Sequence, residues 1–249
     1  MKRLVASWTF RIALLLILAS AFSYAIHYLI FHDVHHIFLY MIGDFGFLFI
    51  DVLLVLLIIE RLLARRAKRD IMQKLNMVIG TFFSEVGLEL LHRFGDFVDN
   101  AEELEKDILI DRRWTRKDFK RATEQAESFS YSITINADKL VSLNDFLRDK
   151  HSFLIRLLEN PNLLENQKFT DLLWAVFHVS EELNFRDSLQ TLPASDVNHL
   201  KNDLKRAYSK IVSEWILYTA HLKESYPFLF SLAARINPLN PKASPVVLD

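Results

Sequence analysis

The sequence predicts an all-α protein in which an N-terminal transmembrane helical hairpin is followed by a cytosolic helical bundle. The 249 residues include only five glycines and six prolines, and apolar residues recur three and four positions apart over most of the chain. Two apolar runs of about 20 residues lie near the beginning, each long enough to cross a bilayer. No long segment alternates with period two, so no sheet is expected.

The hairpin is predicted over residues 1–64, with spans at about 12–31 and 37–59. A cleaved signal peptide is the rival interpretation of the first run, because the run follows a basic segment and contains Ala19-Ser20-Ala21 and Ser23-Tyr24-Ala25. The apolar run continues past both possible cleavage sites, which favours a span.

The placement of lysine and arginine predicts the orientation of the hairpin. Lys2, Arg3 and Arg11 precede the first span, a basic cluster follows the second, and residues 32–36 contain neither residue type. The positive-inside rule therefore places both termini in the cytoplasm and the short turn outside the cell membrane. The basic cluster is either a topology signal or a binding surface for anionic lipid headgroups. The residues proposed for headgroup binding are Arg65, Arg66, Lys68 and Arg69.

Two aspartates, Asp44 and Asp51, interrupt the second apolar run. They are seven residues apart and therefore share a helix face. An ionised carboxylate near the middle of a bilayer costs about 3 kcal/mol on insertion scales, so the pair suggests a proton or cation pathway. The alternative is a structural or pairing role, with the span starting at Phe45 and only Asp51 lying deep in the membrane.

The cytosolic helical domain is predicted over residues 65–236. One helix continues from the membrane and is closed by Gly95, and the acidic run 96–107 is expected to be a connection. Ser195 is expected to cap the penultimate helix, and Pro227 to break it. Residues 237–249, with three prolines, are expected to form an extended tail. The remaining helices are predicted at 114–130, 136–159, 169–186, 196–223 and 226–236.

Small residues on the first of these helices predict close packing. Gly80, Ser84 and Gly87 form a strip beside its apolar face, and small side chains allow another helix to approach closely. The partner is either another helix of the same chain or a second copy of the protein.

Histidine and glutamate spacing suggests a metal site. Glu89 and His92 have the three-residue spacing of a carboxylate–histidine ligand pair in helical bundles, and His178 has Glu181 and Glu182 three and four residues away. Hydrogen-bonded surface histidines are the alternative interpretation, and convergence of Glu89, His92, His178 and Glu181 would distinguish the two.

Composition excludes several classes of function. There is no cysteine, so disulfides, thiolate metal sites and cysteine nucleophiles are excluded. The net charge is -1, which does not indicate nucleic-acid binding, and the glycines form no phosphate-binding motif. No cofactor is predicted, and no enzyme activity is assigned.

Three passages together resemble a family of uncharacterised prokaryotic two-pass membrane proteins. They are LNMVIGTFFSEVG (Leu75–Gly87), WAVFHVSEEL (Trp174–Leu183) and YPFLFSLAARINPLNP (Tyr226–Pro241). The resemblance extends over most of the chain after the second span. It implies a hairpin followed by a helical domain, and it carries no established activity.

The function hypothesis is a membrane-anchored, non-enzymatic helical protein with a partner-binding or regulatory role. Its partners would be the lipid bilayer and either further copies of itself or another membrane or cytosolic protein, and not nucleic acid. The alternatives are an oligomeric ion or proton pathway lined by Asp44 and Asp51, and a metal-dependent helical-bundle enzyme.

Overall fold

The computed structural model describes residues 2–240 and 242–246, with the backbone alone for residues 2–7, Thr9 and Glu105. The side chains of Lys2 and Arg3, used above to orient the hairpin, lie outside the description. Pro241 and residues 247–249 of the predicted tail also lie outside it. Within the described residues the chain is helical, with one isolated β-bridge, between Val98 and Ile133, and no strand.

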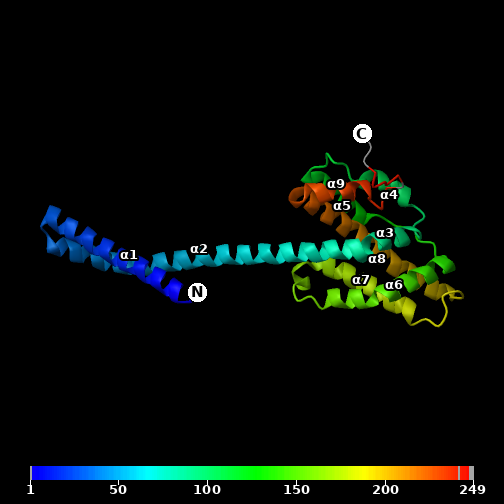
Figure 1. Cartoon of the computed structure of the whole chain (residues 1–249), viewed down its shortest axis with the longest axis horizontal. Coiled ribbons are helices and arrows are strands. Elements are labelled where there is room, and N and C mark those ends of the chain that lie inside the picture. Colours follow the sequence, from blue (N-terminus) through cyan, green and yellow to red (C-terminus); the bar gives the residue numbers. More distant parts are fainter. Residues whose placement is uncertain (1, 241, 247–249) are drawn as a thin grey trace. The chain divides into compact units, whose positions relative to one another are not determined.

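The chain divides into two compact units, between Ala67 and Lys68. The first unit contains α1 (Lys2–Phe31) and the beginning of α2 (Val34–Phe82), labelled in Figure 1. A two-residue turn joins these helices. His32 has a positive φ of 53°, as residues that end helices often do, and Asp33 Oδ1 accepts a hydrogen bond of 3.1 Å from the backbone N–H of His36.

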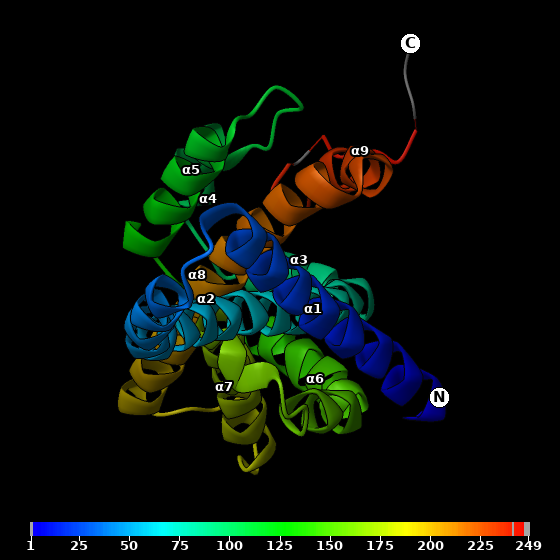
Figure 2. The ribbon, with the colours of Figure 1, turned by 90° about the vertical axis from the view of Figure 1, so that its left-hand side faces the viewer.

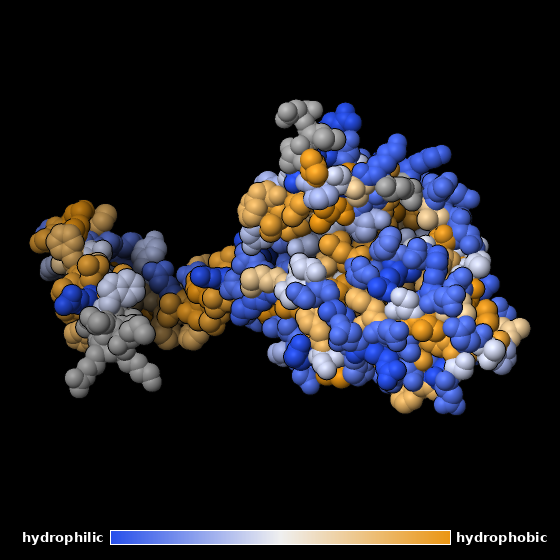
Figure 3. Space-filling model, turned by 45° about the vertical axis from the view of Figure 1, so that its right-hand side comes forward, coloured by the Kyte–Doolittle hydropathy of each residue, from blue (hydrophilic) through white to orange (hydrophobic). Residues whose placement is uncertain are grey.

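Both helices of the first unit are apolar and exposed. By length and composition, the segment Phe10–Phe31 and the helix that begins at Val34 are each able to cross a membrane, and neither apolar stretch is buried. Figure 3 shows orange, hydrophobic side chains over much of this unit, whereas hydrophilic side chains prevail on the visible face of the second unit.

The second unit is a helical bundle built around α8 (Ala194–Ser225). This helix packs against α3, α5, α7 and α9. Figures 1 and 2 show α5 and α9 on one side of α8, and α6 and α7 on the other. A π-helical turn, Phe83–Gly87, continues from α2 into the bundle, and a short 3-10 helix, Leu163–Glu165, precedes α7. The other helices are α3 (Leu88–Gly95), α4 (Ala101–Ile108), α5 (Arg116–Ser128), α6 (Ala137–Leu158), α7 (Gln167–Asn184) and α9 (Pro227–Arg235).

Aromatic side chains form the centre of the bundle core. Phe83 lies edge-on to Trp215 at a ring-centroid distance of 5.1 Å, and Phe82 lies edge-on to Phe169 at 5.5 Å. All four are almost completely buried. Edge-to-face pairs of this kind stabilise a core beyond the burial of their area. The bundle therefore has its own hydrophobic core, as its sequence pattern predicts.

The structure agrees with the helices predicted for the second half of the chain and corrects two details. From α5 to α9, the ends lie within two residues of the predicted ends, and α8 ends at Ser225, just before Pro227, as expected. The prediction that the acidic run is only a connection is wrong, because the run contains α4. In α4, Leu104 and Ile108 lie one turn apart and are buried. Ser195 is not a cap: α8 begins at Ala194 without a side-chain cap.

Candidate functional site

Four side chains of metal-ligating types meet on α7 and α8, and we call this set the α7–α8 cluster. Helix α7 contributes His178 and Glu182, and helix α8 contributes His199 and Asp203. Each helix therefore supplies a histidine followed four residues later by a carboxylate. Residues four apart lie on the same helix face, so the packing of α7 against α8 brings the two pairs together.

The ligand atoms of the α7–α8 cluster all lie within 4.8 Å of one another. Asp203 Oδ2 lies 3.4 Å from His178 Nε2 and 3.2 Å from His199 Nε2. Glu182 Oε1 lies 3.7 Å from His178 Nε2, and Glu182 Oε2 lies 3.4 Å from His199 Nε2. Each imidazole thus lies between a carboxylate of its own helix and a carboxylate of the neighbouring helix.

The cluster has a buried base and an exposed rim. Asp203 is 3% exposed, and its Oδ2 atom has no hydrogen-bond partner among the described residues. Its other oxygen, Oδ1, lies 3.3 Å from Arg206 Nη1. The side chains of His178 and His199 are 43% and 51% exposed. The imidazoles therefore connect a buried carboxylate oxygen with solvent.

Arg186 fixes the carboxylate of Glu182 at one edge of the cluster. Its Nη1 atom donates to the Glu182 carbonyl oxygen and, at 2.7 Å, to Oε2. Its Nε and Nη2 atoms donate to the two oxygens of Asp196 at 2.8 and 2.6 Å. The hydrogen bonds from Arg186 lower the pKa of both Glu182 and Asp196. Both carboxylates are therefore held ionised, and Asp196 offsets the charge of Arg186.

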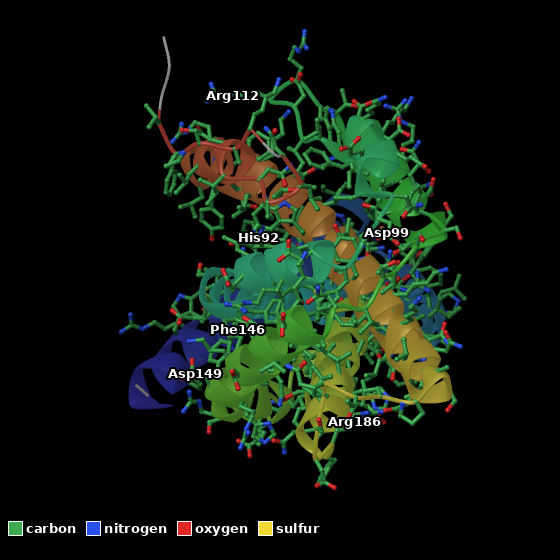
Figure 4. The ribbon with its side chains drawn as sticks, turned by 90° about the vertical axis from the view of Figure 1, so that its right-hand side faces the viewer. His92, Asp99, Arg112, Phe146, Asp149 and Arg186 are labelled. Atoms are coloured by element: carbon green, nitrogen blue, oxygen red, sulfur yellow. The ribbon has the colours of Figure 1, made fainter. Side chains whose placement is uncertain are left out.

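The four predicted metal ligands are not brought together, and only His178 belongs to the α7–α8 cluster. Glu89 is exposed on α3 and forms a 2.7 Å ion pair with Arg93. His92 is also exposed on α3, and Figure 4 shows it well apart from Arg186, which borders the cluster. Glu181 differs from Glu182 by one residue, a rotation of about 100° around the helix, and is not part of the cluster.

Two residues of the cluster, His199 and Asp203, were missed from the sequence. Their signal was present as a second histidine–carboxylate pair with four-residue spacing, on the helix after the one carrying His178. Consecutive helices joined by a short connection are usually antiparallel neighbours. Matching four-residue pairs on two such helices could therefore have identified the set.

The structure separates the two intramembrane aspartates of the sequence prediction. Asp44 lines a cavity of 380 Å³ between α1 and α2, together with His27, His36 and Tyr40. The rings of His27 and His36 stack at a centroid distance of 5.9 Å. Asp51 is exposed and does not line this cavity. Of the two aspartates, only Asp44 therefore lies beside other polar side chains of this cavity.

The small-residue strip has three different environments. A Cβ atom added at Gly80 would lie 2.7 Å from the hydroxyl oxygen of Tyr218 on α8. Gly87 is buried in the π-helical turn, where a Cβ atom would meet the rings of Phe82 and Phe83, and Ser84 is exposed. A tyrosine side chain of α8 therefore lies close to Gly80, and aromatic rings of the same turn lie close to Gly87.

The predicted headgroup-binding residues are all exposed on α2. They are Arg65, Arg66, Lys68 and Arg69.

Comparisons with known proteins identify the family. The model described as "Uncharacterized protein MJ1433, C-terminal helical domain" matches residues 71–235, and "MJ1433, N-terminal helical domain" matches residues 2–63. The uncharacterized protein MJ1433 of Methanocaldococcus jannaschii is 43% identical over 234 residues, which cover 93% of each chain. No solved structure matches the chain. The chain belongs to the MJ1433 family, which confirms the predicted uncharacterised family with prokaryotic members.

Proposed function

We propose that this member of the MJ1433 family is a two-pass protein of the cell membrane that binds or regulates a partner through its helical bundle. The proposal that α1 and α2 anchor the protein in the membrane rests on one observation, that the apolar stretches of both helices are entirely unburied. A large apolar side chain gains about 1.5–3 kcal/mol when it is removed from water. Helices also satisfy their own backbone hydrogen bonds, as a bilayer requires.

The charges that flank the two helices support one orientation. Arg11 lies at the start of the first segment, just before the apolar run that begins at Ile12, and Arg61, Arg65 and Arg66 follow the second apolar stretch. The turn at His32 and Asp33 carries no lysine or arginine. Both ends of the chain would then lie in the cytoplasm, with the turn outside.

The absence of cysteine makes this topology directly testable. A single cysteine introduced as His35→Cys lies in the first turn of α2, and Lys106→Cys lies at an exposed position of α4 in the bundle. In intact cells, a membrane-impermeant maleimide should label His35→Cys and should label Lys106→Cys only after lysis. Equal labelling of both variants in intact cells, or release of the protein from membranes by alkaline carbonate, would contradict the proposal.

Exposed aromatic residues on the bundle support the partner-binding part. Trp174 is 56% exposed on α7, and Phe185, eleven residues later and therefore on the same side, is 77% exposed. The two side chains are about 16 Å apart along the helix axis and do not form one continuous patch, but exposed aromatic side chains are enriched where proteins bind partners. In mild detergent we expect a complex larger than one chain that Trp174→Ser/Phe185→Ser disrupts. A monomer without a co-purifying protein would contradict this part.

The cavity beside Asp44 favours a second candidate function, an ion or proton pathway. Its acidic group and stacked imidazoles are the groups that carry protons within membranes. This candidate predicts proton flux in reconstituted vesicles that Asp44→Asn abolishes. Flux that survives both Asp44→Asn and Asp51→Asn would exclude it.

A further inference from the structure

We infer that the α7–α8 cluster is a binding site for one divalent transition-metal ion, such as Zn²⁺, Co²⁺ or Fe²⁺. The donors would be the Nε2 atoms of His178 and His199 and carboxylate oxygens of Glu182 and Asp203. This inference is independent of the membrane anchor and of the partner-binding role. Imidazole donors favour these ions, whereas Mg²⁺ and Ca²⁺ prefer oxygen donors alone.

The distances between the donor atoms fit such an ion. Zinc lies about 2.0–2.2 Å from nitrogen and carboxylate oxygen, so two donors in tetrahedral geometry are about 3.4 Å apart. The four separations between an imidazole Nε2 and a carboxylate oxygen are 3.2, 3.4, 3.4 and 3.7 Å. Glu182 contributes a different oxygen to each of its two separations, and the ligand atoms of the cluster all lie within 4.8 Å of one another. The four side chains are therefore close to the spacing of a coordination shell, and an ion would draw them together.

The unpartnered oxygen of Asp203 is a second, independent indication. A buried carboxylate oxygen without a partner costs several kcal/mol, so native structures nearly always satisfy it. Asp203 Oδ2 points between two Nε2 atoms and makes no hydrogen bond to either. A cation at the centre of the cluster would bind this oxygen, while both imidazoles, in their neutral form, direct lone pairs at the same ion.

Neighbouring side chains already orient both carboxylates. Arg186 holds Glu182, and Arg206 lies 3.3 Å from Asp203 Oδ1, which leaves Oδ2 directed at the imidazoles. Groups that orient ligands in this way commonly accompany metal sites. Because the histidines are about half exposed, an ion can enter from solvent, and a water molecule can occupy an open coordination position.

The test is a metal titration of the tag-free, full-length protein in detergent after chelator treatment. Zn²⁺ should bind one ion per chain in calorimetry, and Co²⁺ should produce visible d–d absorption. Mg²⁺ should give neither signal. Asp203→Asn and His199→Gln should each weaken Zn²⁺ binding at least 100-fold. Glu181→Gln is the matched control, because it removes a neighbouring carboxylate of α7 outside the cluster, and it should bind as the unmodified chain does.

Thermal unfolding distinguishes loss of the site from loss of the fold. Zn²⁺ should raise the Tm of the unmodified chain and of Glu181→Gln, since a ligand that binds only the folded state stabilises it. His199→Gln, at an exposed position, should fold with a similar Tm in chelator and show no Zn²⁺-dependent rise. The inference is overturned if the unmodified chain binds no Zn²⁺, or if binding persists unchanged in both Asp203→Asn and His199→Gln.

Discussion

The hydroxyl of Tyr218 occupies the space beside Gly80, where a Cβ atom would lie 2.7 Å from the tyrosine oxygen and 3.4 Å from the ring carbon that bears it. The Tyr218 ring also stacks on Phe83 at a centroid distance of 5.3 Å, which limits its freedom to move. Glycine at position 80 therefore leaves room for the tip of the Tyr218 side chain.

Gly80→Ala should lower the free energy of unfolding by about 1–3 kcal/mol, the usual cost of overpacking, although alanine has the better helix propensity. Tyr218→Phe removes the clashing oxygen, so Gly80→Ala/Tyr218→Phe should be more stable than Gly80→Ala alone. Chemical denaturation of the four proteins measures this coupling. If Tyr218→Phe does not restore stability to Gly80→Ala, the contact between the alanine Cβ and the tyrosine hydroxyl is not the cause of the destabilisation.

The side chain of Asn237 anchors the segment after α9. Trp215 Nε1 donates a hydrogen bond of 2.9 Å to Asn237 Oδ1, and both residues are almost completely buried. Asn237→Ala leaves a buried indole N–H unsatisfied and should destabilise the protein by about 2 kcal/mol. Asn240→Ala, three residues further on, should change the Tm little. Equal Tm values for the two variants would show that the Trp215 contact does not stabilise the fold.

Stability should depend on the ionisation of Glu214, which is 3% exposed on α8. Burial raises the pKa of Glu214 from 4.5 to about 7, with Lys168 opposing the shift and Glu127 adding to it. The folded state therefore holds this proton more tightly than the unfolded state. Stability is greatest below pH 4.5 for this group and falls as the pH rises through 7, by roughly 3 kcal/mol in total.

Glu214→Gln should remove this dependence, so the variant should gain stability over the unmodified chain at pH 8 and not at pH 4.5. Denaturation curves at the two pH values measure the difference. Glu124→Gln, an exposed position on α5, is the control and should keep the original pH profile. A parallel profile for Glu214→Gln would mean that Glu214 is not protonated in the folded state.

Arg186 should contribute more to stability than a surface arginine does. Its side chain is 16% exposed and bridges Glu182 and Asp196, so Arg186→Gln leaves two carboxylates without their cation and should cost about 2–3 kcal/mol. Arg113→Gln is the control, because Arg113 is 90% exposed beside Asp111 and should change little. Indistinguishable Tm values for Arg186→Gln and Arg113→Gln would contradict the larger contribution of Arg186 to stability.

The sequence predicted the helices of the bundle well, because each has a continuous apolar stripe of its own. It failed at α4, where only Leu104 and Ile108 mark a buried face within a highly charged run. The sequence predicted half of the candidate site, because His178 and Glu182 lie on one helix. The identity of their partners, His199 and Asp203, depends on which face of α8 meets α7. Spacing within a single helix does not contain that information.

The π-helical turn Phe83–Gly87 determines which side chains of α3 face the core. Two sets of buried side chains flank the turn, at positions 75, 79 and 82 before it and at positions 90, 91 and 94 after it. On an uninterrupted α-helix, which turns about 100° per residue, the two sets would point in directions about 100° apart. The extra residue of a π turn cancels this offset, so both sets face one core. Deleting one residue between Phe83 and Gly87 would therefore leave a regular α-helix with Leu90 and Phe94 still facing the core. Inserting one residue into a regular helix at this point, or straightening the turn at its present length, would instead rotate both side chains by about 100°.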